Sequence, residues 1–341
     1  MAEYENLLEI KNLSFSFKTY GGTVKAVRNV SLTLRKGEIL GIVGESGCGK
    51  SVTAQCIMRL NPEPPGFFEG GEILYKGKDV LKMSKAELKA LRSREIGFIF
   101  QDPMTSLNPT MRVGKQIEEV FHGHKDISKA EIHKKVLNIM RLVGISDAEK
   151  RYRQYPHELS GGMKQRIMIA IALVSDPTMI ICDEPTTSLD VTIEAQILDL
   201  LLELREKFGT SIIMITHDLG VIAKLCDRVV VMYGGKVLEN GTVDEIFYET
   251  AHPYTYGLMN SIASLDTDKN SVLTPIPGTP PDLFAPPKGC PFAARCDYAM
   301  KVCLEHPPEY TNLTEEHRSA CWLQHEMAPK VDLRGKRKET V

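Results

Sequence analysis

The sequence lacks the features that would place it in a membrane by itself. No uninterrupted apolar run approaches the roughly 18 residues that a membrane-spanning helix requires. The N-terminal stretch Met1 to Asn6 is acidic and has neither the basic nor the apolar region of a signal peptide. The formal net charge is only −2, which argues against a general affinity for nucleic acid or anionic membranes. We therefore expect a cytoplasmic protein that acts at a membrane only through a partner.

Closely spaced cysteine pairs are also missing. The eight cysteines form a scattered set (Cys48, Cys56, Cys182, Cys226) and a C-terminal set (Cys290, Cys296, Cys303, Cys321). The scattered set is typical of small buried hydrophobes. Disulfides are rare in a reducing cytoplasm, so the C-terminal set predicts a metal site. Its C-x5-C-x6-C-x17-C spacing suits an iron–sulfur cluster or zinc, although the tight C-x2-4-C pair usual for zinc is absent. Unligated thiols are a third possibility.

The stretch from Gly44 to Ser51, called here the phosphate loop, carries the most specific chemistry. It reads G-x-x-x-x-G-K-S between an apolar run, Ile39–Val43, and a helix-compatible run that ends near Leu60. Backbone N–H groups of such a loop face phosphate oxygens at a helix N-terminus. Lys50 is predicted to reach the β- and γ-phosphates, and the Ser51 hydroxyl to bind Mg²⁺. The other predicted nucleotide-binding positions of the loop are Gly44, Ser46, Gly47, Cys48 and Gly49.

The remaining pattern predicts an α/β fold with one large and one small unit. Residues 7 to 35 alternate apolar and polar side chains, as half-buried antiparallel strands do, and Gly70–Gly77 is expected to join their sheet. Short apolar runs without alternation predict a parallel sheet: Ile96–Phe100, Met179–Cys182, Ile212–Ile215 and Val229–Met232. Helical spacing over about residues 102–175 predicts an inserted helical subdomain, and another helix is expected from Thr192 to Phe208.

The predicted architecture is therefore a P-loop NTPase core with a parallel sheet, an N-terminal antiparallel β subdomain, an inserted helical subdomain and a small cysteine-rich C-terminal extension. Residues 1–250 are assigned to the ATP-binding domain and residues 251–341 to the extension, because a proline-rich connector begins the last part of the chain. No internal repeat and no second phosphate loop occurs.

Two further patterns fit nucleotide chemistry. The run Met179–Cys182 ends in Asp183, which is placed to hold Mg²⁺, and Glu184, which could polarise the attacking water. An acidic pair after a strand is a weak signal alone and a strong one when it follows a phosphate loop. The stretch Leu159–Gly162, called here the signature, places a capping serine and two glycines before an apolar helix that begins at Met163. It predicts a second anion site at a helix start.

These motifs, in this order, resemble the nucleotide-binding subunit of an ATP-binding-cassette transporter. Gln101 matches the family's glutamine loop, Ser188-Leu189-Asp190 its aspartate loop and His217 its switch histidine, so that the likeness covers about residues 7 to 250. The resemblance implies a head-to-tail pair of subunits that sandwich two ATP molecules. Each ATP would lie between the phosphate loop of one subunit and the signature of the other. Ser160, Gly161 and Gly162 would then bind the nucleotide held by the partner.

The resemblance also implies roles for the remaining motif residues. Gln101 would bind Mg²⁺ and couple the site to membrane subunits. His217 would contact the γ-phosphate and support the water positioned by Glu184, whereas a histidine after a strand is otherwise most simply structural. Asp190 would communicate across the subunit interface.

An aromatic residue of the N-terminal strands should stack on adenine if the resemblance holds. Phe17 is the first choice by its position in the sequence. Phe15 and Tyr20 are the alternatives, and the competing interpretation of Phe17 is a core aromatic.

After residue 250 the chain resembles the ATPases of oligopeptide and dipeptide importers. The likeness runs over about residues 250 to 323 and is carried by His252–Tyr256, Pro275–Pro281, Gly289–Phe292 and the clustered cysteines. It favours a [4Fe–4S] cluster, structural or redox-sensing, on Cys290, Cys296, Cys303 and Cys321, with zinc as the alternative. Importers of nickel and other small solutes share much of this pattern and are the alternative for the substrate.

The resulting prediction is an ATP-hydrolysing subunit at the cytoplasmic face of the cell membrane that powers peptide import. Its expected partners are a second, related or identical ATPase subunit, two transmembrane permease subunits and an extracellular solute-binding protein, and no nucleic acid. A DNA-maintenance ATPase would need a long coiled coil between phosphate loop and signature, and a translation-associated ATPase would normally carry two cassettes. A soluble, redox-regulated ATPase outside transport is the remaining alternative.

Overall fold

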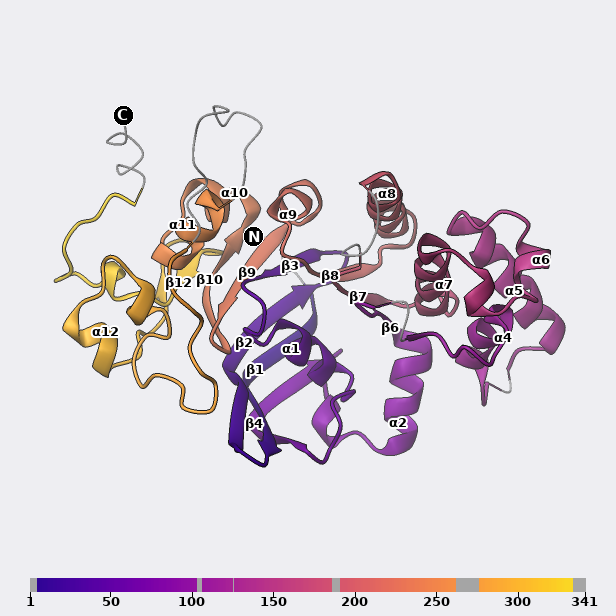
Figure 1. Cartoon of the computed structure of the whole chain (residues 1–341), viewed down its shortest axis with the longest axis horizontal. Coiled ribbons are helices and arrows are strands. Elements are labelled where there is room, and N and C mark those ends of the chain that lie inside the picture. The colour runs from indigo at the N-terminus through magenta and orange to yellow at the C-terminus, as the bar shows by residue number, and fades with distance from the viewer. Residues whose placement is uncertain (1–4, 103–105, 125, 186–190, 262–275, 334–341) are drawn as a thin grey trace. The chain divides into compact units, whose positions relative to one another are not determined.

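A computed structural model of the chain describes residues 5–102, 106–124, 126–185, 191–261 and 276–333 (Figure 1). Its contacts divide the chain into two compact units. Unit 1 consists of Met1–Asn6, Leu34–Ile39 and Val80–Ile215, and unit 2 of Leu7–Thr33, Leu40–Asp79 and Thr216–Val341. The assignment of residues 1–250 and 251–341 to separate domains stays a prediction.

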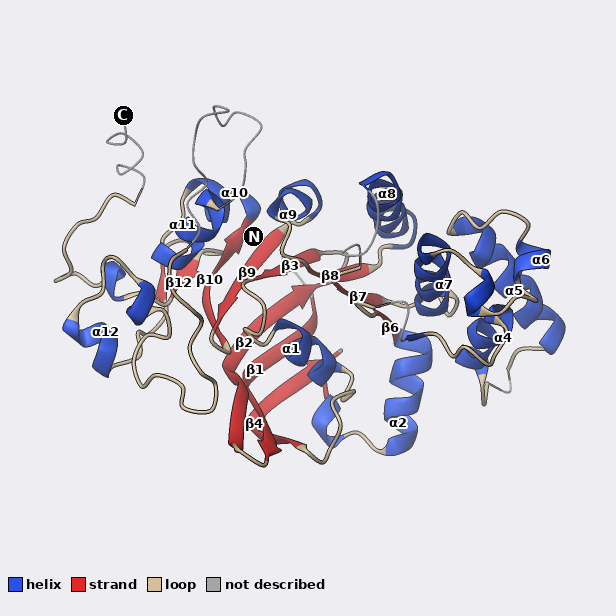
Figure 2. Ribbon diagram, viewed as in Figure 1, coloured by secondary structure: helices blue, strands red, loops and turns tan. Residues whose placement is uncertain are grey.

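Unit 2 contains the predicted antiparallel sheet, apart from the ends of its first two strands. The strands are β1 (Asn6–Thr19), β2 (Gly22–Arg35), β4 (Gly66–Tyr75) and β5 (Lys78–Asp79), in the order β2-β1-β4-β5. Figure 2 shows β1, β2 and β4 side by side, and β1 pairs antiparallel with β4. The alternation of the sequence buries one set of side chains, among them Leu8, Ile10 and Phe15. The prediction that Gly70–Gly77 joins this sheet is confirmed for Gly70–Tyr75, while Lys76 and Gly77 form the turn to β5.

A second group of strands in unit 2 carries the phosphate loop. Strand β3 (Ile39–Val43) pairs in parallel with β9 (Arg228–Tyr233) through Leu40–Val43, and β9 pairs antiparallel with β10 (Lys236–Thr242). The short strands β12 (Arg318–Ser319) and β11 (Thr311–Asn312) then continue the ladder from β10. The C-terminal extension is thus hydrogen-bonded into the same group of strands. The helices of unit 2 are α1 (Lys50–Ile57), α9 (Leu219–Leu225), α10 (Val243–Tyr248), α11 (Pro253–Asn260) and α12 (Lys301–Glu305).

Unit 1 contains three parallel strands, β6 (Ile96–Ile99), β7 (Met179–Asp183) and β8 (Ser211–Ile215), with β7 in the middle. All three are apolar and largely buried, as the runs without alternation predict. Its helices are α2 (Lys85–Ala90), α4 (Val113–Glu118), α5 (Lys129–Leu142), α6 (Ala148–Arg151), α7 (Gly161–Leu173) and α8 (Val191–Phe208). Single-turn helices complete both units: Val80–Lys82, Leu91–Glu95, Glu119–Phe121, Pro156–Glu158, Ala293–Arg295 (η5) and Trp322–Gln324.

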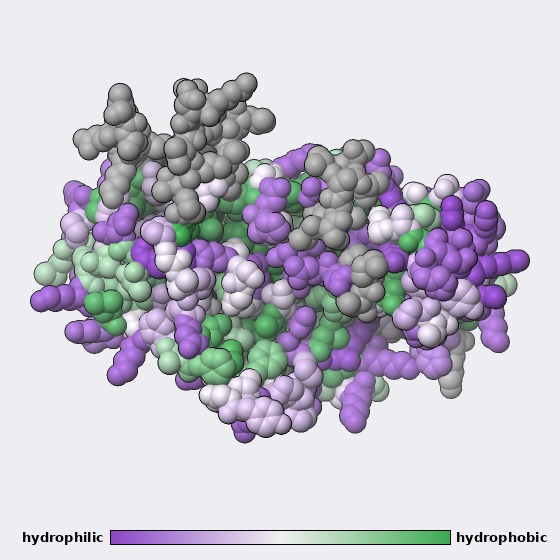
Figure 3. Space-filling model, viewed as in Figure 1, coloured by the Kyte–Doolittle hydropathy of each residue, from purple (hydrophilic) through white to green (hydrophobic). Residues whose placement is uncertain are grey.

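Helices α4 to α7 form the predicted helical subdomain and gather into one cluster (Figure 1). Helix α5 begins with a capping box, in which Ser128 and Glu131 satisfy each other's backbone N–H groups. Its inner face buries Val136, Ile139 and Met140, while the surface over the cluster is mainly hydrophilic (Figure 3). In the described parts of the chain, no helix is both long and apolar enough to span a bilayer.

Candidate functional site

The phosphate loop lies between β3 and α1, in the strand–loop–helix setting that the sequence predicts. Gly44 has φ +148° and Gly49 has φ +99°, in the region that favours glycine. A Cβ atom at Gly44 would lie 2.1 Å from the Met232 carbonyl oxygen, and one at Gly49 would lie 2.4 Å from the Ala26 carbonyl oxygen. Neighbouring backbone therefore packs against the loop so closely that only glycine fits at these two positions.

Lys50 is buried at the start of α1 and points back into the loop. Its Nζ donates hydrogen bonds to the carbonyl oxygens of Gly44 at 2.8 Å and Glu45 at 3.0 Å. These partners are neutral, so the ammonium keeps its full charge for an anionic ligand. Burial raises the pKa of the nearby Cys48 thiol although Lys50 opposes the shift, which keeps this cysteine protonated and unreactive.

Glu45, inside the loop, is held by two side chains that were not predicted from the sequence, Tyr254 and Arg295. The Tyr254 hydroxyl accepts a hydrogen bond from the Glu45 backbone N–H at 2.8 Å. Arg295 Nη1 donates to Glu45 Oε2 at 2.6 Å and to the Tyr233 hydroxyl at 3.0 Å. Tyr254 belongs to the His252–Tyr256 stretch that carries the family likeness, so a signal for it was present. A single arginine 250 positions away from Glu45 gives no such signal.

The structure brings Gln101 and Glu184 together in unit 1. Gln101 Nε2 donates to Glu184 Oε2 at 2.9 Å, and the Glu184 backbone N–H donates to the Ile215 carbonyl oxygen at 2.9 Å. Glu184 has φ +47°, a left-handed backbone conformation that costs about 1–2 kcal/mol for a residue other than glycine. Asp183, directly before it, is 3% exposed at the end of β7. Strained backbone that aims a carboxylate is typical of a catalytic position.

The signature also lies in unit 1, at the exposed start of α7. Ser160 caps this helix and accepts a hydrogen bond from the Met163 N–H at 3.4 Å, as the sequence predicts. Among the described residues, a Cβ atom at Gly161 would meet no atom within 4 Å. The exposed start of α7, with its backbone N–H groups, suits an anion that approaches from outside the chain.

The other predicted residues differ in how far the structure describes them. His217 is exposed just after β8, before α9, whose N-terminus Asp218 caps. Phe15 is fully buried against Phe68 and so belongs to the core. Phe17 is half-buried and packs edge-on against Phe15, with 5.1 Å between the ring centroids. Tyr20 is fully exposed. Ser188, Leu189 and Asp190 lie outside the described residues.

The four clustered cysteines line one small cavity in unit 2, together with His252 and Phe292. Burial raises the pKa of Cys290 to about 11 and that of Cys321 to about 12, so both are neutral thiols when no metal is bound. His252 Nδ1 accepts a hydrogen bond from the Tyr254 N–H at 3.0 Å, while its buried Nε2 has no hydrogen-bond partner among the described residues. In that same part of the chain, no set of three or more His, Cys, Asp or Glu side chains is arranged to hold a metal ion.

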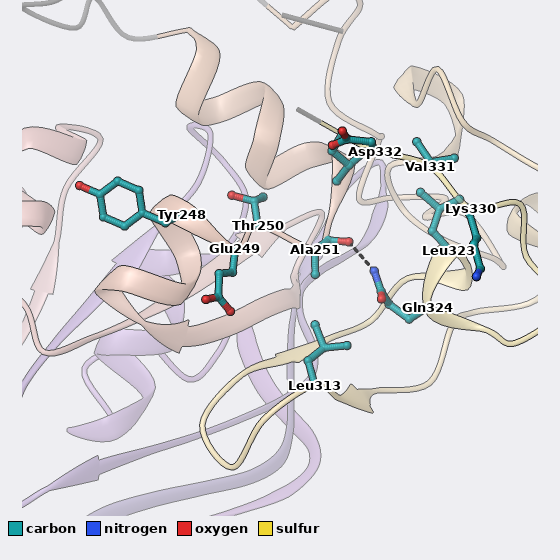
Figure 4. A pocket seen from close by; sticks show the side chains of 11 residues that line it. Tyr248, Glu249, Thr250, Ala251, Leu313, Leu323, Gln324, Lys330, Val331 and Asp332 are labelled. Carbon is teal, nitrogen blue, oxygen red and sulfur yellow. Dashed lines mark hydrogen bonds between the residues drawn. The ribbon is translucent and has the colours of Figure 1, made fainter. Parts of the chain in front are cut away.

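Two larger cavities lie away from the nucleotide motifs. One, of about 730 Å³, lies between the end of α10 and the C-terminal segment (Figure 4). Two of its lining residues are joined by a hydrogen bond, which the Gln324 side chain donates to the Ala251 carbonyl oxygen at 2.8 Å. The other, of about 1150 Å³, lies in the helical subdomain and is lined by residues between Met111 and Tyr152. Neither contains a predicted ATP-binding residue, so neither is the nucleotide site.

Comparison with known families and proteins agrees with the motifs. Residues 27–187 match the family model "ABC transporter", and residues 238–303 match "Oligopeptide/dipeptide transporter, C-terminal region". The oligopeptide transport ATP-binding protein OppD of Bacillus subtilis is 56% identical over 97% of this chain and 93% of its own length. The dipeptide transport ATP-binding protein DppD of Lactococcus lactis is 52% identical over 97% of this chain and 94% of its own.

Solved structures share the core of the fold. A dimeric ATP-binding cassette in a post-hydrolysis state, bound to ADP and phosphate, has a TM-score of 0.62 at 28% identity and covers 69% of this chain and 98% of its own. The protein cbiO1 of Clostridium perfringens has a TM-score of 0.60 at 30% identity and covers 72% and 92%. The predicted α/β ATPase core and its class as a transporter ATPase are confirmed, while the cysteine cofactor is not part of what these comparisons support. The chain belongs to the ABC transporter family, as an ATP-binding protein of the oligopeptide and dipeptide transport type.

Proposed function

We propose that this chain hydrolyses ATP to power the uptake of oligopeptides or dipeptides through separate membrane permease subunits. The observation that carries the proposal is similarity along both parts of the chain, cassette and extension together, to proteins named for oligopeptide and dipeptide transport. Residues 238–303 match the family model "Oligopeptide/dipeptide transporter, C-terminal region". The likeness of the extension therefore favours peptides.

ATP binding rests on the phosphate loop and Lys50. Loop N–H groups and the N-terminus of α1 offer partial positive charge to the phosphates, and Lys50 adds a full charge. Ser51 and Asp183 supply the oxygen ligands that Mg²⁺ prefers, and a buried carboxylate at a strand end fits such a cation. The ion, once bound, would neutralise charge on the β- and γ-phosphates.

Hydrolysis requires a water molecule aimed at the γ-phosphate, and Glu184 is the base that we assign to it. The hydrogen bond from Gln101 fixes one carboxylate oxygen and so orients the carboxylate that would accept a proton from the water. We further assign Gln101 to Mg²⁺ and to coupling with the membrane subunits, and His217 to the γ-phosphate and the attacking water. Asp190 would act across the subunit interface, and Phe17 would stack on adenine.

The active form that we propose is a head-to-tail pair of ATPase subunits. The open start of α7 at Ser160, Gly161 and Gly162 would bind the triphosphate held by the partner's phosphate loop. A related cassette is described as a dimer bound to ADP and phosphate, which supports this arrangement. ATP binding would close the pair and hydrolysis would reopen it.

The proposed partners are a second ATPase subunit, related or identical, two transmembrane permeases and an extracellular solute-binding protein. The chain would then lie at the cytoplasmic face of the cell membrane. Isolation of the intact complex from native membranes, followed by identification of its subunits, tests this proposal. Two permeases and a solute-binding protein would support it, and co-purification with DNA or ribosomes would contradict it.

For the extension we propose a [4Fe–4S] cluster on Cys290, Cys296, Cys303 and Cys321. Four thiols on one cavity are the donor set that such a cluster uses, although their placement does not form a ready site for a single ion. The cluster would fasten the extension. Anaerobic purification followed by iron and sulfide analysis tests it, and stoichiometric zinc without iron would replace it by the zinc alternative.

The base assignment is tested with Glu184→Gln in the assembled transporter. We expect nucleotide binding to persist and turnover to fall by about 10²- to 10⁴-fold, because the amide cannot accept the proton from water. Glu203→Gln is the matched control, since Glu203 lies exposed on α8 in an ion pair with Lys207. Unchanged hydrolysis in Glu184→Gln, with the control normal, would remove Glu184 from this role.

A further inference from the structure

The phosphate loop contains a negative charge of its own. Glu45 follows Gly44 directly, and its backbone carbonyl accepts a hydrogen bond from Lys50. A carboxylate beside a triphosphate site repels the ligand unless another group neutralises it. The loop itself supplies only Lys50, which the phosphates need.

The neutralising group comes from the C-terminal extension. The Arg295 side chain is 6% exposed, and its Nη1 lies 2.6 Å from Glu45 Oε2. Its Nη2 donates to the Ile276 carbonyl oxygen at 3.0 Å and its Nε to the Pro277 carbonyl oxygen at 2.8 Å. All three nitrogens of the guanidinium are thus used, which fixes its position. Burial alone would lower the pKa of Arg295, but the hydrogen bonds to Glu45 and Tyr233 outweigh it and raise the pKa.

Three aromatic rings hold this contact in place. Tyr233 packs against Tyr254 at 4.5 Å between ring centroids and against Phe292 at 5.3 Å, and Tyr254 packs against Phe292 at 5.2 Å. Tyr254 also accepts a hydrogen bond from the Glu45 N–H, so the extension holds Glu45 at both its backbone and its carboxylate. Arg295 ends the short helix η5, between Cys290 and Cys296.

We propose that Arg295 is a positioning residue for ATP binding, which neutralises Glu45 and holds its carboxylate away from the phosphates. The cysteine-rich extension thereby becomes part of the nucleotide site without touching the nucleotide. This inference rests on ATP binding by the cassette and is independent of which solute is transported. Loss of the neutralising charge should weaken binding of ATP more than that of ADP, because ATP carries the larger negative charge.

The test measures ATP and ADP affinity, and the steady-state kcat and KM, of the full-length protein in its complex. For Arg295→Gln we expect the Kd and KM for ATP to rise at least about tenfold with kcat within about twofold, and a smaller rise for ADP. The double variant Glu45→Gln/Arg295→Gln should restore ATP affinity to within about threefold, because no charge is then left unpaired. Arg295→Lys, which keeps the charge, should remain within about threefold of the parent.

Arg318→Gln is the matched control. Arg318 also joins the extension to the rest of unit 2, through hydrogen bonds to the Asn240 side chain and the Ser31 carbonyl oxygen, and neither partner belongs to the phosphate loop. We expect its ATP affinity to be unchanged. An equal loss in this control would mean that Arg295 only supports the fold of the extension, and the proposal would be wrong.

Glu45→Gln alone keeps the proposal testable if Arg295→Gln does not fold. Removing the negative charge should leave ATP affinity equal to the parent or higher. A tenfold weaker affinity in this variant, or no rescue in the double variant, would overturn the assignment. These affinities do not depend on which solute is transported. The proposal for Arg295 and the proposal of peptide transport can therefore be refuted separately.

Discussion

The two helix starts that we assign to ATP, α1 after the phosphate loop and α7 after the signature, are built in opposite ways. The phosphate loop is held in shape by its own chain: Lys50 is buried, and Glu45 is held by Tyr254 and Arg295, while Ser46 and Gly47 between them are exposed. Ser160 and Gly161 of the signature are exposed, and an added Cβ atom at Gly161 would touch no other described residue. The phosphate loop is thus supported by other residues of its own chain, whereas the start of α7 is exposed to other molecules. This difference is what a site shared by two copies of the chain requires.

The same contrast explains the position of the tightest glycines. A loop that must bind phosphates with its backbone benefits from being rigid before the ligand arrives, since less entropy is then lost on binding. Met232 and Ala26 press against Gly44 and Gly49 and provide this rigidity. At the start of α7 the hydrogen bond from the Met163 N–H to the Ser160 cap is long, at 3.4 Å, and the helix start is exposed to a partner.

The largest effect is expected from Lys50→Met, which removes the only full positive charge that the loop offers to the phosphates. We expect kcat/KM for ATP to fall by about 10³-fold, in the range seen when a group that stabilises transition-state charge is lost. Nucleotide binding and hydrolysis are measured on the assembled complex. The fold should survive, because a methionine can occupy the space of the lysine stem. Turnover within tenfold of the parent would show that the loop does not act through this ammonium.

The next largest effects are expected from glycine substitutions at the two helix starts, which should affect different steps: ATP binding by the single subunit, or turnover by the assembled pair. Gly161→Phe should leave ATP binding to the single subunit unchanged, since no described atom lies within 4 Å of a Cβ atom at Gly161. It should lower turnover of the assembled pair by about 10²-fold, as loss of one anion-binding contact does. Gly49→Ala should weaken binding by the single subunit itself, because its Cβ would lie 2.4 Å from the Ala26 carbonyl oxygen at a φ of +99°.

Gly161→Ala is the control for size and should stay near the parent in both assays. The comparison fails if Gly161→Phe hydrolyses ATP at the parental rate in the pair. It also fails if a strictly monomeric preparation turns over as fast as the assembled protein.

Features that depend on local pattern were predictable from the sequence, and long-range ones were not. Strands β3, β6, β7, β8 and β9 follow from apolar runs, and the Ser160 cap follows from its place before an apolar helix. The contact of Arg295 with Glu45 joins residues 250 positions apart, and no spacing rule reaches that far. The positive φ of Glu184 is equally hidden, because any residue type can be forced into that region by its surroundings.

The extension shows the same limit at the level of topology. Its two strands, β11 and β12, are each two residues long and too short for an alternating pattern. They still join the ladder of β10, and Glu239 of β10 binds the buried His317 beside them at 2.8 Å. The sequence predicted a separate cysteine-rich piece, and its hydrogen bonding into the strands that carry the phosphate loop became visible only in the structure.

A smaller effect is expected from the residue that we propose to stack on adenine. Phe17→Ala should raise the KM for ATP about fivefold, since a stacked base contributes about 1 kcal/mol or more, and kcat should change little. Phe17→Tyr should preserve affinity, and Tyr20→Ala is the control, because Tyr20 is fully exposed. A rise in KM for Tyr20→Ala but not for Phe17→Ala would move the stacking role to Tyr20 and leave Phe17 as a partner of Phe15 in the core.

The smallest effect tests whether ATP binding at the phosphate loop depends on the cysteine cavity. Cys296 follows Arg295 directly, so a change in how its sulfur is held should shift the guanidinium against Glu45. We expect Cys296→Ser to raise the KM for ATP roughly threefold, as a small misplacement of a supporting group does, and to leave the exposed signature unaffected. Cys226→Ser, at the end of α9 and outside the cysteine cavity, should not change KM. If both variants keep the parental KM while Arg295→Gln loses affinity, then the arginine acts on the phosphate loop without help from the cysteines. In that case the residues that support the phosphate loop include the aromatic cluster of Tyr233, Tyr254 and Phe292 but not the cysteines.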